Sequence, residues 1–258
     1  MALGLAVMLA FLLAGSYFVG RAVQREMEVA RLQADFVSAV SHEFRSPLAT
    51  MRQLSELLAA GRVPAEERRQ YYYDLLASES RRLQRLVENL LDFGKLEAGA
   101  PYRLEPVDPG ALVESVVSEF EAQLSSPGCH IEASGNKGSA RMLADPEAVS
   151  LALRNLLDNA VKYSPGCPTV WVDWAPQDGR IAIRVRDRGS GIPPEERERI
   201  FRKFVRGAAA DAGNVKGAGV GLAMVERVVK AHGGEIRVES EPGVGSTFTL
   251  LFPMVNSV

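Results

Sequence analysis

The feature that most constrains the fold is a long helical repeat followed by an abrupt break. Between Ala22 and Ala60 there is no glycine and a single proline. Apolar residues recur every seven positions in two rows, one at Val37, Phe44, Met51 and Leu58 and the other at Val40, Pro47 and Leu54. Two such rows, three residues apart, are the a and d positions of helices that pack in a bundle. The Gly-Arg-Val-Pro segment at 61–64 predicts the turn that ends this helix.

A second helix is predicted from about residue 65 to 97, with heptad rows at Leu76, Leu83 and Leu90 and at Leu86 and Phe93. Two amphipathic helices joined by a short turn form a hairpin that cannot cover its own apolar seam. Pairing with a second copy into a four-helix bundle would cover it. The N-terminal part therefore predicts an all-α dimerisation domain and a homodimer.

The first twenty residues differ from this repeat because residues 2–20 carry no charge. About 19 residues at a rise of ~1.5 Å cross most of a ~30 Å hydrocarbon layer. Arg21 and Arg25 follow directly and mark the cytoplasmic side. We therefore expect a transmembrane helix over 1–20 and membrane attachment through 2–20. A signal peptide is the alternative, but no basic region precedes the apolar run.

Beyond residue 99 the pattern changes to mixed helix and strand. Gly, Pro and Asp concentrate in a linker over 99–109, and Asp145-Pro146 offers an N-cap and an N1 proline for a helix that runs to Tyr163. Helices are also predicted at 111–124 and 221–232. Strand-like alternation occurs at 170–174, 181–185, 236–239 and 247–252. This order predicts an α+β sandwich, with helices on one face of a mixed sheet.

Composition excludes several classes of function. Thirty Lys and Arg against 32 Asp and Glu leave a net charge of -2, which gives no indication of nucleic-acid binding. The two cysteines, Cys129 and Cys167, are far apart, and the three histidines lack ligand spacing. We expect neither a disulfide framework nor a structural metal.

His42 is the candidate nucleophile of the hairpin. If Val37 and Phe44 are a positions, His42 falls at f, opposite the seam and facing solvent. Glu43 is adjacent, and Ser46 lies one turn further on the same face. A neutral imidazole can attack phosphorus, and a neighbouring carboxylate can take its proton. On position alone, an ordinary surface histidine is the alternative.

Three polar groups in the second half indicate a nucleotide site. Asn155 and Asn159 share one helix face and could offer oxygens to Mg²⁺, with Lys162 as a point charge for phosphate. The second group is Asp187 with Gly189 and Gly191, which follow the end of a predicted strand. A third group opens a helix and could expose N–H groups to phosphate, at Gly217, Gly219 and Gly221. Each glycine group alone is weak, because turns use the same residues.

The order and spacing of these motifs resemble the sensor histidine kinases of two-component systems. Residues 36–48, FVSAVSHEFRSPL, are similar to the H box of that family, and the later motifs, with Phe201/Phe204 and Gly243/Gly245, are similar to its N, G1, F, G2 and G3 boxes. The resemblance covers residues 30 to 253. It implies a Bergerat-type ATP-binding domain, shared with DNA gyrase, a heat-shock chaperone and mismatch-repair ATPases.

The resemblance also implies roles. His42 would be autophosphorylated with Glu43 as base, and the phosphoryl group would pass to an aspartate of a cytoplasmic response regulator. Ser46 stands where Thr or Asn is usual, at a position used in dephosphorylating the regulator. ATP and Mg²⁺ are the implied cofactors, with Asn159 and Asn155 at the metal. The implied nucleotide-binding residues are Asn155, Asn159, Lys162, Tyr163, Asp187, Gly189, Gly191, Arg206, Gly217, Gly219, Gly221, Leu222 and Thr247.

The expected organisation is a transmembrane helix at 1–20, a linker helix at 21–35, a dimerisation and phosphotransfer domain at 36–100 and an ATP-binding domain at 101–258. The resemblance places the protein in the inner membrane of a prokaryote, with its kinase domains cytoplasmic. Two alternatives stay open, a degenerate or phosphatase-biased scaffold and a hydrolytic ATPase of the same superfamily. The hydrolytic members place a glutamate where this chain has Asn155, and an amide cannot activate water.

Overall fold

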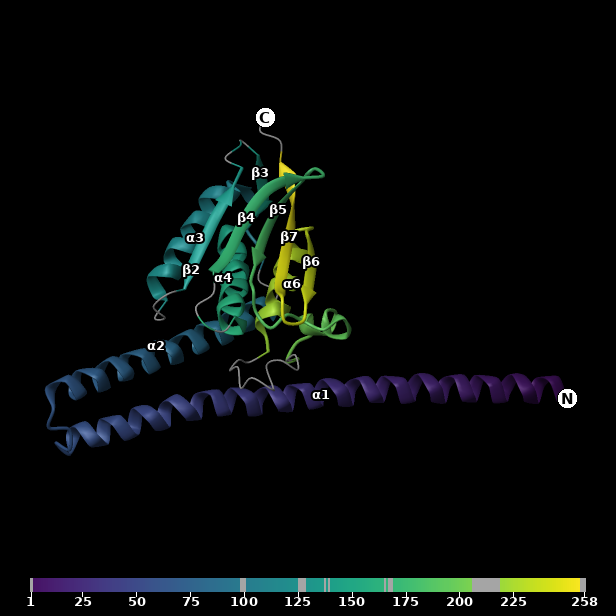
Figure 1. The fold of residues 1–258 in the computed structure, drawn as a ribbon. Helices are drawn as coiled ribbons and strands as arrows, with labels where there is room; N and C mark the ends of the chain where they lie inside the picture. The colour runs from purple at the N-terminus through teal and green to yellow at the C-terminus, as the bar shows by residue number, and fades with distance from the viewer. Residues whose placement is uncertain are drawn as a thin grey trace.

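The computed structural model describes residues 2–97, 101–124, 129–136, 138, 140–164, 166, 169–205 and 219–255. Two long helices, α1 (Ala2–Ala59) and α2 (Glu66–Glu97), make up the N-terminal part. In Figure 1, α2 folds back along the C-terminal stretch of α1, and the N-terminal stretch of α1 extends beyond the rest of the molecule. The turn contains Gly61 in the left-handed region, at φ +63°, as the Gly-Arg-Val-Pro segment predicts.

The hairpin covers only part of its apolar seam. Pro47 and Leu54 of the predicted d row are buried within one chain. Phe44 and Met51 of the a row are only half-buried, and Val37 is 57% exposed. A two-helix unit cannot enclose two heptad rows, so the incomplete burial agrees with the prediction that the hairpin needs a partner.

The C-terminal part alternates strands and helices. In chain order the elements are β1 (Glu105–Val107), α3 (Pro109–Gln123), β2 (His130–Gly135), β3 (Arg141–Ala144), α4 (Pro146–Tyr163), β4 (Thr169–Gln177), β5 (Arg180–Arg186), the short 3₁₀ turns η1 (Pro194–Glu196) and η2 (Arg199–Phe201), α6 (Gly221–Ala231), β6 (Glu235–Glu241) and β7 (Gly245–Val255). Strand β7 pairs with β3, β5 and β6, and the path across the sheet is β1-β3-β7-β5-β4-β2. The pair β2–β4 is parallel and the other pairs are antiparallel, so the sheet is mixed as predicted.

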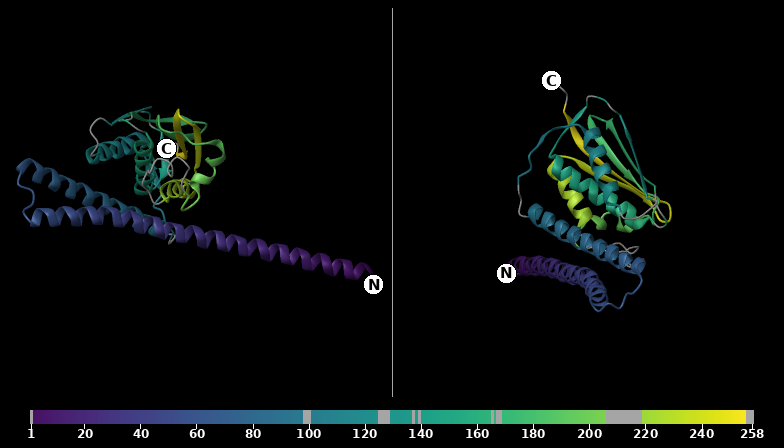
Figure 2. Two further views of the ribbon diagram at one scale, coloured as in Figure 1. Left: turned by 60° about the horizontal axis from the view of Figure 1, so that its bottom comes forward. Right: turned by 90° about the vertical axis from the view of Figure 1, so that its left-hand side faces the viewer.

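Helices α3, α4 and α6 cover one face of this sheet, as the right-hand view of Figure 2 shows. The core lies between the two layers. Its most deeply buried residues include Leu153, Leu156 and Leu157 of α4, with Ile183 and Phe252 from the sheet. Strand β4 alternates buried and half-buried side chains along most of its length, because one face meets the helices and the other meets solvent. The predicted α+β sandwich is confirmed.

Aspartate caps set the starts of two helices. Asp145 accepts hydrogen bonds from the N–H groups of Glu147 and Ala148, and Pro146 takes the first helical position. This is the cap that the sequence predicts. Helix α3 starts two residues before the predicted position, because Asp108 caps it and Pro109 is its first residue. Caps of this kind satisfy N–H groups that lack a partner within the helix.

Among the residues that the structure describes, no helix is long and apolar enough to cross a membrane. The predicted transmembrane helix over 1–20 therefore has no support from the structure.

Candidate functional site: an exposed histidine beside a nucleotide-type cleft

His42 lies on the solvent-facing side of α1 and is exposed, which confirms its predicted f position. Helix α1 continues through Pro47 without ending. Because proline has no N–H group, the backbone carbonyl of Glu43, four residues earlier, loses its helical donor. The Thr50 hydroxyl donates to the Ser46 carbonyl at 3.2 Å one turn later. The helix therefore lacks one backbone hydrogen bond at the residue that follows the histidine.

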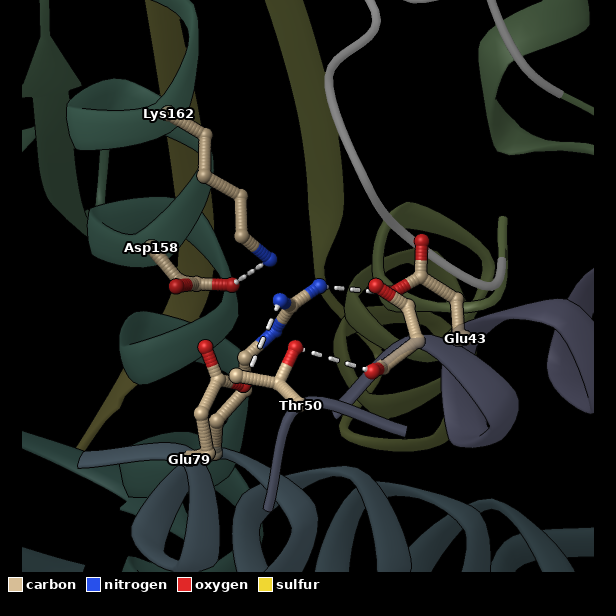
Figure 3. Close-up of polar contacts among 7 residues, drawn as sticks. Glu43, Thr50, Glu79, Asp158 and Lys162 are labelled. Carbon is tan, nitrogen blue, oxygen red and sulfur yellow. Dashed lines mark hydrogen bonds and ion pairs between the residues drawn. The ribbon is translucent and has the colours of Figure 1, made fainter. Parts of the chain in front are cut away.

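Glu43 turns toward the second helix of the hairpin. Its Oε2 accepts a hydrogen bond from Nη2 of Arg82 on α2 at 2.9 Å. Nη1 of the same guanidinium lies 3.8 Å from Oε2 of Glu79. Figure 3 shows Glu43 and Glu79 on the hairpin, facing the Asp158–Lys162 ion pair on α4 of the other domain. The acid next to the histidine is therefore already directed toward the C-terminal half.

A cleft of about 1030 Å³ runs between the hairpin and the C-terminal half. Glu43, Pro47 and Arg82 line its hairpin side. The residues that line its other side include many that the sequence singles out, namely Asn155, Asn159, Lys162, Tyr163, Asp187, Gly191, Gly219, Gly221 and Leu222. One continuous space thus joins the neighbourhood of His42 to the residues expected at the nucleotide.

Asp187 is held at the end of β5 by the backbone. Its Oδ1 accepts from the N–H of Gly189 at 2.8 Å and of Ser246 at 3.2 Å. The residue is only 8% exposed. Burial raises the pKa of its carboxyl above the ordinary 3.8, although the two backbone hydrogen bonds act in the opposite direction. The structure assigns Oδ2 no donor among the described residues, so this oxygen is available to an N–H donor in the cleft.

The glycines after Asp187 are required by close backbone packing. A Cβ on Gly189 would stand 2.5 Å from the Tyr163 carbonyl oxygen, and one on Gly191 would stand 2.0 Å from that of Glu241. Gly191 is also left-handed, at φ +67°. The loop is tied to α4 by the N–H of Ser190, which donates to the Tyr163 carbonyl at 3.0 Å. The sequence pattern marks these glycines but does not reveal this packing reason.

The predicted amide pair projects from α4 into the cleft. Nδ2 of Asn155 donates to the Leu151 carbonyl at 2.9 Å, and Oδ1 faces Gly221, whose Cβ, if present, would lie 2.8 Å from it. Asn159 is half-buried one turn later. Lys162 forms an ion pair with Asp158 on the same helix. Helix α4 therefore brings the two amide side chains and Lys162 to the cleft.

Among the described residues, no side chain caps the backbone N–H groups at the start of α6. Its N-cap residue is Val220, which makes no side-chain capping hydrogen bond. Gly219 is left-handed, at φ +70°, and its carbonyl accepts from the N–H of Phe204 at 2.9 Å. Uncapped N–H groups at a helix start favour phosphate. Arg206 and Gly217 lie outside the described residues.

The donor set of the cleft fits ATP with Mg²⁺. Asp187 offers an oxygen suited to an exocyclic amine, and the start of α6 offers N–H groups suited to phosphate. Among the described residues, no group of three or more His, Cys, Asp or Glu could hold a metal ion. A Mg²⁺ ion here would rely on Asn159, Asn155 and phosphate oxygens, a combination that suits this hard cation.

Thr247 does not reach this cleft. It lines a small groove with Arg186 and Glu239, where strands β5 and β6 end and β7 begins. Side chains alternate along β7, so its neighbours Ser246 and Phe248 line the main cleft instead. Gly189 lies buried behind the cleft wall.

Sequence reasoning missed two serines. Ser246 donates its N–H to Asp187, and the Ser240 hydroxyl accepts from the N–H of Ile192 at 2.8 Å. The position of Ser246 next to Gly245 was the available signal, since the sequence pattern had already marked that glycine.

Two family matches cover most of the chain. Residues 32–99 match the His Kinase A (phospho-acceptor) domain. Residues 144–256 match the histidine kinase-, DNA gyrase B- and HSP90-like ATPase family. An exposed histidine on a helical hairpin and a cleft lined by the N, G1 and G2 motifs are thus found in the two domains where this class carries them. The chain belongs to the sensor histidine kinases of two-component systems.

Particular relatives agree with this class. The sensor-like histidine kinase SenX3 of Mycobacterium tuberculosis is 35% identical over 235 residues, which cover 90% of this chain and 57% of that protein. The chain thus spans little more than half of this relative. The crystal structure of full-length ShkA in complex with AMPPNP matches with a TM-score of 0.60 and 30% identity, over 86% of this chain and 46% of ShkA. The mycobacterial sensor histidine kinase MprB matches at 30% identity and a TM-score of 0.51, over 59% of this chain and 98% of the MprB chain.

Proposed function

We propose that this chain is a protein-histidine kinase that phosphorylates His42 from ATP held by its C-terminal domain. One observation carries the proposal: Glu43, the neighbour of the exposed His42, lines the same cleft as Asn155, Asn159 and Asp187. Nucleophile, base and nucleotide site would then meet through a movement of one domain against the other.

In the proposed reaction a ring nitrogen of His42 attacks the γ-phosphorus in line. The new N–P bond forms as the bond from phosphorus to the β–γ bridging oxygen breaks, and ADP leaves. Glu43 accepts the ring proton. Lys162 and the N–H groups at the start of α6 offset charge on the phosphates. Mg²⁺ would be held by Asn159 with support from Asn155, and its charge would stabilise the transferring phosphoryl group.

The phosphoryl group would then pass to an aspartate of a response regulator. Ser46 is the candidate for positioning water in the reverse, phosphatase reaction, since its hydroxyl lies one turn from His42. The functional unit would be a homodimer through the hairpin, divided into 36–100 and 101–258. Attachment to a prokaryotic inner membrane through residues 2–20, followed by a linker helix at 21–35, stays a prediction from the sequence.

Incubation with γ-labelled ATP tests the proposal. We expect label on the protein that is lost in acid and kept in base, which is the behaviour of a phosphoramidate. His42→Gln should abolish the label and keep nucleotide binding. A hydrolytic ATPase would release phosphate without labelling the protein, and that result would end the proposal. A scaffold would bind ATP weakly or not at all and would leave both signals absent.

A further inference from the structure

The hairpin contributes a cation to the cleft that the proposed reaction does not yet use. Arg82 projects from α2, and its Nη2 donates to Oε2 of Glu43 at 2.9 Å. The two residues are 39 positions apart in sequence, so only the hairpin brings them together. Both line the cleft that contains Asn155 and Asn159.

This ion pair differs from the exposed pairs elsewhere on the molecule. The side chain of Glu43 is only 13% exposed and that of Arg82 is 31% exposed. By contrast, Arg52 and Glu56 on the outside of α1 are 79% and 73% exposed. Exposed pairs contribute little because water and salt screen them, whereas a shielded pair keeps a fixed geometry.

Glu79 gives a second reason to assign Arg82 to Glu43. Oε2 of Glu79 is buried and has no hydrogen-bond partner among the described residues. Arg82 comes no closer than 3.8 Å to it. Glu79 lies on α2, the same helix as Arg82, whereas Glu43 lies on α1, so the guanidinium makes its hydrogen bond across the hairpin and leaves a buried carboxylate oxygen on its own helix unsatisfied. Arg82 instead donates to the carboxylate beside His42.

We propose that Arg82 is a positioning residue that orients Glu43 for the phosphorylation of His42. The inference rests on the proposed role of Glu43 as proton acceptor. A glutamate has three rotatable bonds, and Pro47 leaves its backbone carbonyl without a helical donor. Arg82 holds Oε2 and leaves Oε1 to take the ring proton as the N–P bond forms and ADP leaves. Arg82 itself stays a cation throughout.

The test compares Arg82→Met with the matched control Arg81→Met in the whole chain. Arg81 is the preceding residue on α2 and is exposed. At saturating ATP we expect His42 labelling by the Arg82→Met protein to fall by about 10- to 100-fold, because a misplaced catalytic group costs rate of this order. The KM for ATP should stay within about twofold, since uniform binding is untouched. Arg82→Lys should keep part of the rate, and Arg81→Met should behave as the parent chain.

Chemical rescue separates positioning from hairpin stability. Arg82→Ala leaves a gap at the open cleft, and added guanidinium at millimolar concentration should restore part of the lost rate, whereas sodium should not. If Arg82→Met is labelled with the same kcat as the parent chain, the inference is wrong. A rate loss that follows lost helicity, or one confined to KM, would also overturn it. The parent chain is labelled first: if it carries no acid-labile label, the proposed function itself fails, whereas normal labelling with no Arg82 effect removes only this inference.

Discussion

At the scale of single residues, the proposed function assigns recognition of the nucleotide base to Asp187. Backbone N–H groups hold Oδ1 of Asp187 in place. Replacing Oδ2 with the NH2 group of an amide is therefore the smallest change that should alter recognition of the ligand. Asp187→Asn keeps an oxygen that accepts from the N–H groups of Gly189 and Ser246. It places an NH2 group, which is a donor, opposite the exocyclic amine of adenine, which is also a donor. A hydrogen bond to a charged group contributes about 1.5–3 kcal/mol. We expect ATP affinity to fall by roughly tenfold to a hundredfold, measured by calorimetry, with Asp173→Asn on the sheet surface as the unaffected control.

Acid should act on the same group. Burial raises the pKa of Asp187, so the folded state binds its proton at a higher pH than the unfolded chain does. The contribution of Asp187 to the free energy of unfolding is therefore fully present below pH 3.8, its ordinary pKa, and is lost as the pH rises through the raised pKa of the folded state. Nucleotide binding follows the opposite sign, because the ionised oxygen is the acceptor. On acidification ATP affinity should begin to fall at a pH above 3.8 and should fall more in the parent chain than in Asp187→Asn; identical titrations of the two proteins would contradict this role.

Gly191 allows a paired test of backbone packing. Gly191→Ala adds both left-handed strain and a clash with the Glu241 carbonyl, whereas Gly179→Ala, at φ +72° in open space, adds strain alone. Left-handed strain costs about 1–3 kcal/mol. Gly191→Ala should therefore lower the melting temperature more than Gly179→Ala and weaken ATP binding as well. Equal effects of the two substitutions would show that the contact with β6 is unimportant.

At the scale of elements, a buried histidine connects two helices. His232 at the end of α6 accepts from the N–H of Asp145 at 2.9 Å through Nε2, while Nδ1 lies 2.6 Å from the Val228 carbonyl. His232→Phe removes both bonds and leaves the Asp145 N–H without this acceptor. An unmade hydrogen bond of this kind costs about 1–3 kcal/mol. Denaturant unfolding should register that loss, and His130→Phe at the exposed sheet edge should not.

The elements with strong periodicity or capping signals were predictable, and the weak ones were not. Asp145-Pro146 predicts α4 because cap and proline act locally, and alternation predicts β4 and β5 because each buries one face. Strands β1, β2 and β3 were missed. Strands β1 and β3 have three and four residues, and β2 buries one side chain in six. Short or largely exposed strands of this kind are stabilised by pairing with distant partners, which leaves little trace in the sequence.

The same distinction holds for the site. Asn155, Asn159, Asp187 and the glycines carry motif spacing that is visible in the sequence. The sequence predicted Thr247 at the nucleotide, but its side chain points away from the main cleft. Which side chains of β7 face the cleft depends on the turn that precedes the strand. The link between Glu43 and Arg82 could not be predicted, since it depends on the register of two helices that heptads alone leave free to shift by a turn.

At the scale of the whole molecule, the hairpin exposes apolar side chains that a second copy would cover. Val37, in the predicted a row of α1, is 57% exposed. Replacing it with glutamate should convert a dimer into a monomer, because like charges would face each other across the bundle. Light scattering measures the mass directly. Val244→Glu, at an exposed turn of the sheet, is the control and should leave the mass unchanged.

In the proposed function, the phosphoryl group carried by His42 comes from ATP bound in the cleft between the hairpin and the C-terminal half. Mass spectrometry of peptides kept at neutral to basic pH, with fragmentation that preserves the N–P bond, tests it most directly. After incubation with ATP and Mg²⁺ we expect phosphate on His42 in the parent chain and none in Asn159→Asp. Phosphate on another residue, or undiminished phosphate on His42 in Asn159→Asp, would contradict the account.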